Sequence, residues 1–115
     1  MPFERGDIIE VPFLIPHTNR YANHPCVIIS NNDVYDADDC YICVMLTTST
    51  IDDKFTFLID NSMLVKPNNR DFSQARCHLV SYVLEKHFVN ILSKNRMKPN
   101  AVDRLVQYIV TMSLT

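Results

Sequence analysis

The chain has no apolar run near the ~20 residues that a membrane-spanning helix requires, so a membrane span is not expected. Residues 1–7 lack the apolar segment of a secretory signal peptide, which indicates a cytoplasmic protein. Internal repeats and low-complexity tracts are also missing. With 115 residues, 47% of them apolar, the sequence predicts one folded domain over residues 1–115.

A strong excess of positive charge is missing as well. The chain carries 11 Lys and Arg against 13 Asp and Glu, a net charge of −2 with His neutral. Domains that bind polyanions without specificity are usually strongly basic, so that class of protein is disfavoured. A basic cleft would have to be assembled by folding, because the arginines are scattered along the chain, among them Arg5, Arg20, Arg70, Arg76 and Arg96.

A repeated metal-binding motif is not present. Cys40 and Cys43 have the C-x-x-C spacing, but there is no second such pair and no paired His motif. The pair enters a predicted strand, so its two sulfur atoms should point to opposite faces. We therefore expect no metal and no cofactor, and reduced thiols that pack as small apolar side chains.

The apolar segments that are present predict five strands, near residues 7–14, 26–30, 43–47, 55–59 and 73–83. Prolines and asparagines in residues 15–25 predict a long mobile loop. Residues 85–94 fit either a strand or a short helix.

The clearest helix follows Pro99, since apolar side chains recur there with helical spacing at Val102, Leu105, Val106, Ile109 and Val110. Strands that follow one another without helices between them favour a curved, mainly antiparallel sheet. We therefore expect an α+β fold: a small barrel with a C-terminal helix.

The strand predicted at residues 73–83 carries the most informative polar side chains. Strand alternation places Gln74, Arg76 and His78 on one face, and an apolar set suited to a core on the other: Ala75, Cys77 and Leu79. The polar face therefore holds a permanent cation two positions from an imidazole that titrates near neutral pH. Such a pair is suited to hold a phosphate and to move a proton beside it.

Four segments share an order along the chain: Arg5-Gly6-Asp7-Ile8-Ile9, His24-Pro25-Cys26-Val27-Ile28-Ile29-Ser30, Val44-Met45-Leu46-Thr47-Thr48 and Ala75-Arg76-Cys77-His78. Together with the final helix they resemble the MazF/PemK family of bacterial toxins from toxin–antitoxin pairs. The corresponding family patterns are R-G-[DE]-I-[VW], R-P-x-[LV]-[IV]-[IVL]-[ST], V-x-P-[IVL]-T-[ST] and V-R-C-D.

The resemblance implies an SH3-like barrel, a homodimer, and sequence-specific, metal-independent cleavage of single-stranded RNA. It also implies a cognate antitoxin that covers the RNA groove. The family's cleavage-site Arg, Asp, Thr and Ser carry over to Arg76, His78, Thr47 and Thr48. The sequence departs from the family where His78 replaces Asp, where His24 replaces the Arg before a proline and where Leu46 replaces a proline. The glycines common in the family's first loop are missing too, because the chain has a single glycine.

RNA cleavage without a metal uses the 2′-hydroxyl as nucleophile and needs a base, an acid and donors for the charged phosphorane. His78 could serve as base or acid, Arg76 could hold two phosphate oxygens in its fork, and the hydroxyls of Thr47 and Thr48 could donate to the same phosphate. The further predicted RNA-binding residues are Gln74, His24, Asp7, Arg20 and Tyr21. Among these, Asp7 could orient or neutralise a cation, and Tyr21 could stack on a base.

Two other functions stay open on the sequence. One is a gyrase poison like the CcdB toxins, which share this fold class; fold alone does not fix function. The chain ends in residues 111–115 without the aromatic tail that such poisons use, which ranks this function lower. The other is a degenerate family member that binds RNA or a protein partner without cleaving, a function that the three departures favour.

Overall fold

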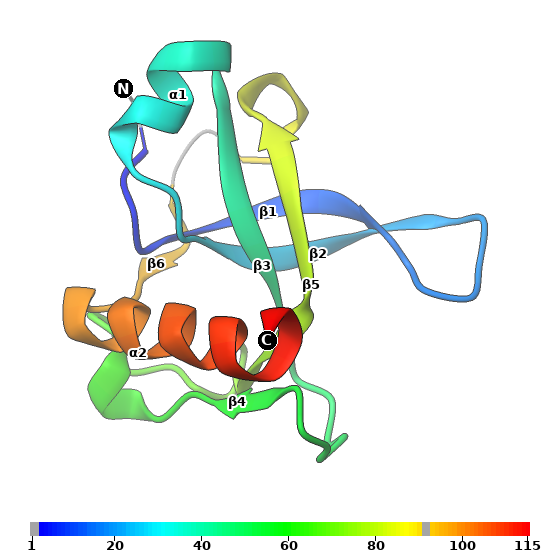
Figure 1. The fold of residues 1–115 in the computed structure, drawn as a ribbon, viewed down its shortest axis with the longest axis vertical. Coiled ribbons are helices and arrows are strands. Elements are labelled where there is room, and N and C mark those ends of the chain that lie inside the picture. Colours follow the sequence, from blue (N-terminus) through cyan, green and yellow to red (C-terminus); the bar gives the residue numbers. More distant parts are fainter. Residues whose placement is uncertain (1–2, 91–92) are drawn as a thin grey trace.

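The computed structural model describes residues 3–90 and 93–115, and in this part of the chain six strands form one antiparallel sheet with the order β4-β5-β3-β2-β1-β6 (Figure 1). The strands are β1 (Asp7–Leu14), β2 (Tyr21–Ile28), β3 (Cys40–Thr47), β4 (Thr56–Leu58), β5 (Gln74–Leu84) and β6 (Asn95–Arg96). The helices are α1 (Asn32–Asp38) and α2 (Pro99–Ile109), which continues into a π-helical turn, η3 (Val110–Leu114). Short 3-10 turns are η1 (Asn61–Met63) and η2 (Glu85–His87).

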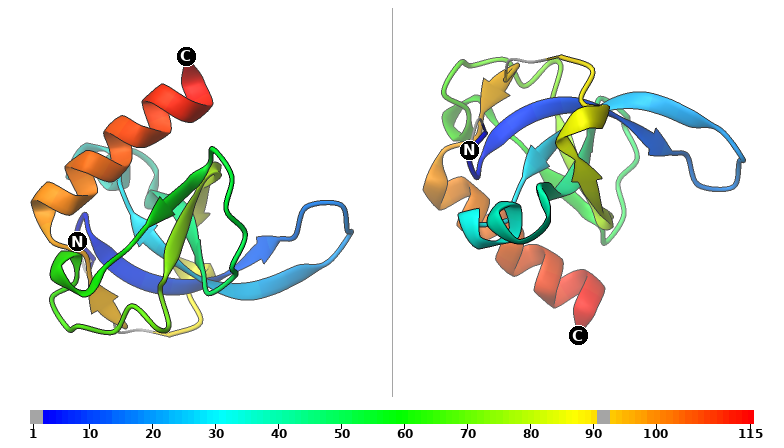
Figure 2. Two further views of the ribbon diagram at one scale, coloured as in Figure 1. Left: turned by 90° about the horizontal axis from the view of Figure 1, so that it is seen from below. Right: turned by 90° about the horizontal axis from the view of Figure 1, so that it is seen from above.

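The sheet curves strongly, and both of its faces are covered (Figure 2). One core lies between the sheet and α2 and includes Ile8, Val27, Val44 and Leu105. The other gathers Phe3, Ile9, Tyr41 and Cys43, with Tyr35 and Phe88 packed against it. Because β3 is buried on both faces, its sequence is apolar almost throughout. The predicted α+β fold, a curved antiparallel sheet with a C-terminal helix, is confirmed.

The C-terminal helix follows its sequence pattern closely. Pro99 is at its first turn, where the missing N–H has no intrahelical partner to lose. The helix buries Val102, Leu105 and Ile109 against the sheet, as the apolar spacing predicts, together with Ala101. Of the other two predicted members, Val106 is half-buried and Val110 is exposed, so the expectation for Val110 is wrong.

The prediction of a long mobile loop at residues 15–25 is wrong in its second half. Residues 21–25 belong to β2 and pair with β1, from Leu14 opposite Tyr21 to Glu10 opposite Pro25. Only residues 15–20 form the connection, closed by a hydrogen bond from the Ile15 N–H to the Arg20 carbonyl. The β1–β2 hairpin therefore projects from the body of the molecule as a paired ribbon (Figures 1 and 2).

Pro12 lies on the outer side of that ribbon. The Ile15–Arg20 hydrogen bond shows that odd-numbered residues of β1 bond to β2, so even-numbered residues face the other edge. In agreement, the carbonyls of Ile8 and Glu10 accept bonds from Lys94 and Val89 on that edge. Pro12 thus has its ring nitrogen where a further strand would need an N–H donor.

Gly6 connects the N-terminal turn to β1 and to the end of β6. Its φ is +99°, its N–H donates to the Ile28 carbonyl at 2.8 Å, and its own carbonyl accepts from the Met97 N–H at 2.8 Å. A Cβ at this position would lie 2.6 Å from the Met97 carbonyl oxygen. Only glycine fits here, since both the dihedral angle and the space exclude a side chain.

All four cysteines are free thiols, and three of them, Cys26, Cys43 and Cys77, are buried. Burial raises the pKa of the Cys77 thiol to about 11, so it stays protonated. In the described residues no group of three His, Cys, Asp or Glu side chains could hold a metal ion. Among the described helices none is both long and apolar enough to cross a membrane. Of the ambiguous segment 85–94, residues 85–87 form η2, while residues 91 and 92 lie outside the described part.

Candidate active site

Arg76 lies near the start of β5, where the residue is buried rather than solvated (7% exposed). Its guanidinium makes a two-pronged contact with one carboxylate: Nη2 donates to Asp53 Oδ2 at 2.8 Å and Nη1 to Asp53 Oδ1 at 3.1 Å. Nη1 also donates to Thr56 Oγ1 at 2.9 Å and to Gln74 Oε1 at 3.2 Å. The fork expected to hold two phosphate oxygens is therefore filled by Asp53.

Asp53 belongs to the loop that connects β3 to β4, and its side chain is 42% exposed. The hydrogen bonds from Arg76 hold the pKa of the Asp53 carboxyl at about 2, helped by the Phe55 N–H that donates to Oδ1 at 2.9 Å. The carboxylate is consequently ionised throughout the neutral range, and it neutralises the buried cation.

Gln74, predicted to bind substrate, holds this loop in place instead. Its side chain is 2% exposed, and its amide nitrogen donates to the carbonyls of Ser49 at 2.7 Å and Ile51 at 2.9 Å. Thr56 closes the loop from the other end, since its hydroxyl donates to the Ile51 carbonyl at 3.1 Å and accepts from the Asp53 N–H at 3.2 Å. Gln74 and Arg76 do share a face, as predicted, but that face is covered by the loop.

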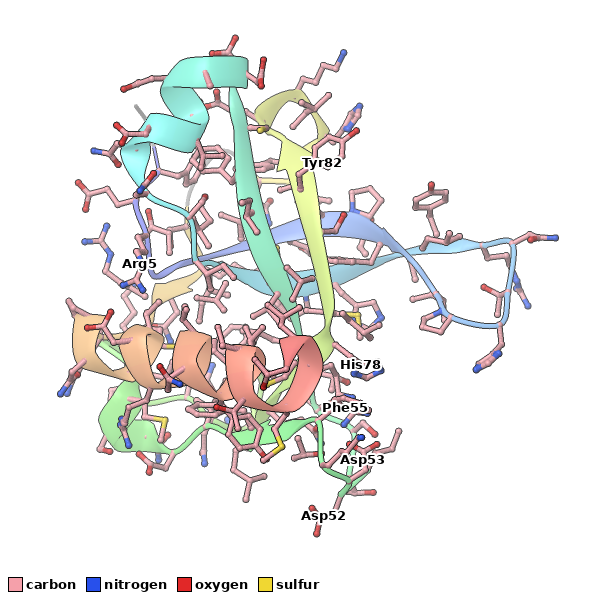
Figure 3. The ribbon with its side chains drawn as sticks, viewed as in Figure 1. Arg5, Asp52, Asp53, Phe55, His78 and Tyr82 are labelled. Carbon is pink, nitrogen blue, oxygen red and sulfur yellow. The ribbon has the colours of Figure 1, made fainter. Side chains whose placement is uncertain are left out.

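His78, two positions beyond Arg76 on β5, is exposed. Its imidazole packs on the ring of Phe55, with ring centroids 4.4 Å apart and planes 33° apart, and both rings lie beside Asp53 (Figure 3). His78 and Phe55 line an open cavity of about 350 Å³, which is also lined by residues of α2 and η3: Ile109, Ser113 and Leu114. The imidazole can therefore reach a group that enters this cavity.

The surroundings of His78 keep it neutral. Partial burial lowers its pKa below the ordinary value, the Arg76 cation lowers it further, and the Asp53 carboxylate opposes both effects. A neutral imidazole at pH 7 can accept a proton, which suits a general base more than a general acid.

Thr47 and Thr48 lie at the end of β3, where Thr47 pairs with Gln74 across the sheet. The Thr47 hydroxyl accepts from the Ser49 N–H at 3.1 Å and keeps its own hydrogen for another acceptor. Thr48 is exposed on the following loop. Of the predicted site residues, Gln74 and Arg76 are hydrogen-bonded to each other, and Thr47 lies opposite Gln74 on the neighbouring strand.

The other predicted RNA-binding residues lie elsewhere. Asp7 is 3% exposed and accepts from Arg96 Nε at 2.8 Å and from the Glu4 N–H at 2.8 Å, so its carboxylate braces the N-terminal turn. His24 is half-buried within β2. Arg20 and Tyr21 are exposed in the projecting hairpin, and Tyr21 lines a hollow with Tyr82 of β5 that is separate from the cavity of His78.

Two residues of the site have no signal in the sequence. Asp53 and Phe55 precede the short strand β4, more than twenty positions from Arg76 and His78, in a segment without a motif. Pairing of β4 with β5, with Thr56 opposite Arg76, brings them there. The β4–β5 register identifies Asp53 and Phe55 as neighbours of Arg76 and His78, whereas the spacing of residues along the sequence does not.

Comparison with known proteins gives one family. The model of the PemK-like, MazF-like toxins of type II toxin–antitoxin systems matches residues 4–109. No curated protein matches the chain.

Solved structures agree in fold. An endoribonuclease from a mycobacterial species superposes with a TM-score of 0.70 at 13% identity, over 97% of this chain and 91% of that one. Its counterpart in complex with a cognate antitoxin, also mycobacterial, gives 0.67 at 13% identity over 96% and 93%. The MazE–MazF complex of Deinococcus radiodurans gives 0.70 at 6% identity over 96% and 95%. Because the family model matches residues 4–109 of the 115, this chain belongs to the PemK-like, MazF-like toxins of type II toxin–antitoxin systems.

Proposed function

We propose that this protein is the toxin of a type II toxin–antitoxin pair and acts as a sequence-specific, metal-independent endoribonuclease on single-stranded RNA. The observation that carries the proposal is the position of His78, a neutral, exposed imidazole on the wall of a cavity beside a buried cation. The two mycobacterial structures of the same fold are named endoribonucleases, which supports the same reaction here.

In this reaction the 2′-oxygen attacks phosphorus, the bond to the 5′-oxygen breaks, and the 5′-oxygen takes up a proton. His78 accepts the proton of the 2′-hydroxyl. The hydroxyls of Thr47 and Thr48 donate to the phosphate oxygens as their charge grows. The Arg76 guanidinium stabilises the phosphate charge electrostatically from beneath the surface. It does not bind two phosphate oxygens directly, because Nη1 and Nη2 already donate to Asp53.

The products of cleavage provide the test. Purified protein incubated with single-stranded RNA in EDTA should release fragments that end in a 2′,3′-cyclic phosphate and begin with a 5′-hydroxyl. His78→Ala protein, purified in parallel, controls for contaminating nuclease. Intact RNA after incubation at high protein concentration contradicts the proposal. Cuts scattered over all sequences contradict the sequence specificity alone.

A second candidate function is RNA or partner binding without cleavage. The observation that favours it is the neutralised Arg76–Asp53 pair, because a guanidinium bound to a carboxylate at both prongs is not free to hold a phosphate. In the same assay this function gives intact RNA together with measurable binding. Inhibition of gyrase with intact RNA would instead indicate a poison like CcdB.

We further propose a homodimer that is bound by a cognate antitoxin in the cytoplasm. Support comes from a hollow of about 590 Å³ between the hairpin and the end of β5, whose lining includes the exposed apolar side chains of Leu14, Tyr21 and Tyr82. The solved relatives bound to antitoxins support the same kind of partner.

Light scattering at micromolar concentrations should therefore return twice the chain mass of 13.3 kDa. A single-chain mass that persists across the concentration range would contradict the dimer.

A further inference from the structure

The loop between β3 and β4 supplies one carboxylate to the centre of the candidate site. Both oxygens of Asp53 are used by the same guanidinium, at 2.8 and 3.1 Å, and this is the planar, two-bond geometry that arginine and carboxylate favour. Because the Arg76 side chain is only 8% exposed, the pair is largely sheltered from solvent on the arginine side. Asp53 therefore decides where the cation of the site points.

We propose that Asp53 is a positioning residue of the cleavage site, which fixes the Arg76 guanidinium beside His78 by filling its fork. The proposal rests on the function proposed above, since it assigns a role within that site. Asp53 itself does not touch the substrate in this arrangement. It acts through the two side chains of β5 that its loop covers.

Asp53 could either stay bound to Arg76 and position it, or move aside so that a phosphate binds Arg76. The geometry of the loop favours the first role. Gln74 and Thr56 bind the carbonyl of Ile51 on one side of Asp53, and the Thr56 N–H donates to the Asp53 carbonyl at 3.1 Å. The Phe55 N–H caps the carboxylate itself. Displacing Asp53 would break this network and would also remove the Phe55 ring from His78.

The charges that surround His78 make the proposal measurable. Arg76 on the same strand disfavours the protonated imidazole, and Asp53 on the loop favours it. Lys54 lies 5.1 Å from the centroid of the Phe55 ring, so its cation is directed at that ring. The helical end contributes the uncharged side chains of Ser113 and Leu114. Removing the Asp53 charge therefore leaves Arg76 unopposed, and protonation of His78 becomes harder.

The experiment compares Asp53→Asn, Asp53→Glu and Asp52→Asn with the parent protein. Asp52 is the matched control, because it carries the same charge one residue earlier but points away from the site at the outer end of the loop (Figure 3). The His78 pKa is measured by NMR titration without RNA, and cleavage rates are measured across pH. For Asp53→Asn we expect the His78 pKa to fall by about half a unit, since solvent screens this exposed imidazole. We also expect cleavage at pH 7 to fall about tenfold as Arg76 loses its orientation.

Asp53→Glu should recover most of the His78 pKa, and Asp52→Asn should match the parent. The proposal is overturned if Asp53→Asn titrates and cleaves like Asp52→Asn, or if it cleaves faster, because a faster variant shows a carboxylate that competes with the phosphate. If the parent protein leaves RNA intact, the proposed function fails, and the His78 titration alone then supports or overturns the positioning role.

Discussion

Replacing His78 with alanine should lower the rate of RNA cleavage about 100-fold or more, the usual loss when a general base is removed. The imidazole lines the cavity and is neutral at pH 7, so it is the group placed to accept the 2′-hydroxyl proton. Parent activity should fall as the pH decreases through the His78 pKa, which lies below the ordinary 6.5 because burial and Arg76 disfavour the charged form. In the alanine variant this acid limb should disappear.

Two further variants at the same position separate chemistry from folding. His78→Gln keeps a polar side chain of similar size that cannot titrate, and it should be as slow as the alanine variant. His78→Asp restores a carboxylate, and it should retain part of the activity with its pH dependence moved to more acid values. Circular dichroism verifies that all three are folded. An alanine variant that cleaves at the parent rate across the pH range contradicts the role of His78.

Replacing Gly6 with alanine should destabilise the protein by about 3 kcal/mol or more, because a side chain is forced into a left-handed backbone conformation and against a backbone oxygen. The added Cβ would lie 2.6 Å from the Met97 carbonyl, and relief would disturb the bonds of Gly6 to Ile28 and Met97. For a domain of this size, that loss corresponds to a melting temperature lower by about 10 °C or more. Denaturant unfolding of parent and variant measures the difference.

Gly6→Asn tests which of the two causes dominates. Asparagine tolerates a positive φ better than alanine does, but it carries the same Cβ. The contact with Met97 predicts that both variants are destabilised to a similar degree. A stable asparagine variant beside an unstable alanine variant would show that the dihedral angle alone matters, and two stable variants would contradict the reading of this turn altogether.

Elements whose burial repeats regularly could be predicted from the sequence. In α2, the helical spacing of Val102, Leu105 and Ile109 indicates the face that packs on the core. In β3, the continuous apolar run indicates that both faces are buried. The first half of β2 could not, because Tyr21, Ala22 and Asn23 are paired with β1 while exposed to water. Backbone pairing without burial leaves little trace in residue type.

The candidate site was predicted only along β5. Period-two alternation correctly placed Gln74 and Arg76 on one face, but it fails beyond Cys77. Ala75 and Cys77 pack in the core beneath α2, whereas Leu79 packs against the other core, because the β3–β5 register shifts between Val44 and Leu46. Alternation also does not say what lies above the Arg76 face. Buried arginines need an acceptor, so the depth of Arg76 implies a carboxylate; the sequence offers 13 acidic residues and does not say which one. The β4–β5 register decides in favour of Asp53.

The position of Pro12 has a consequence for behaviour at high concentration. The outer β1 edge of a projecting ribbon is a template onto which a second molecule can add a strand, and such addition starts aggregation. At Pro12 the required N–H is missing, and the ring occupies the space that an incoming backbone would need. The proline thus permits a long, exposed hairpin in a protein of low net charge, whose copies repel one another only weakly.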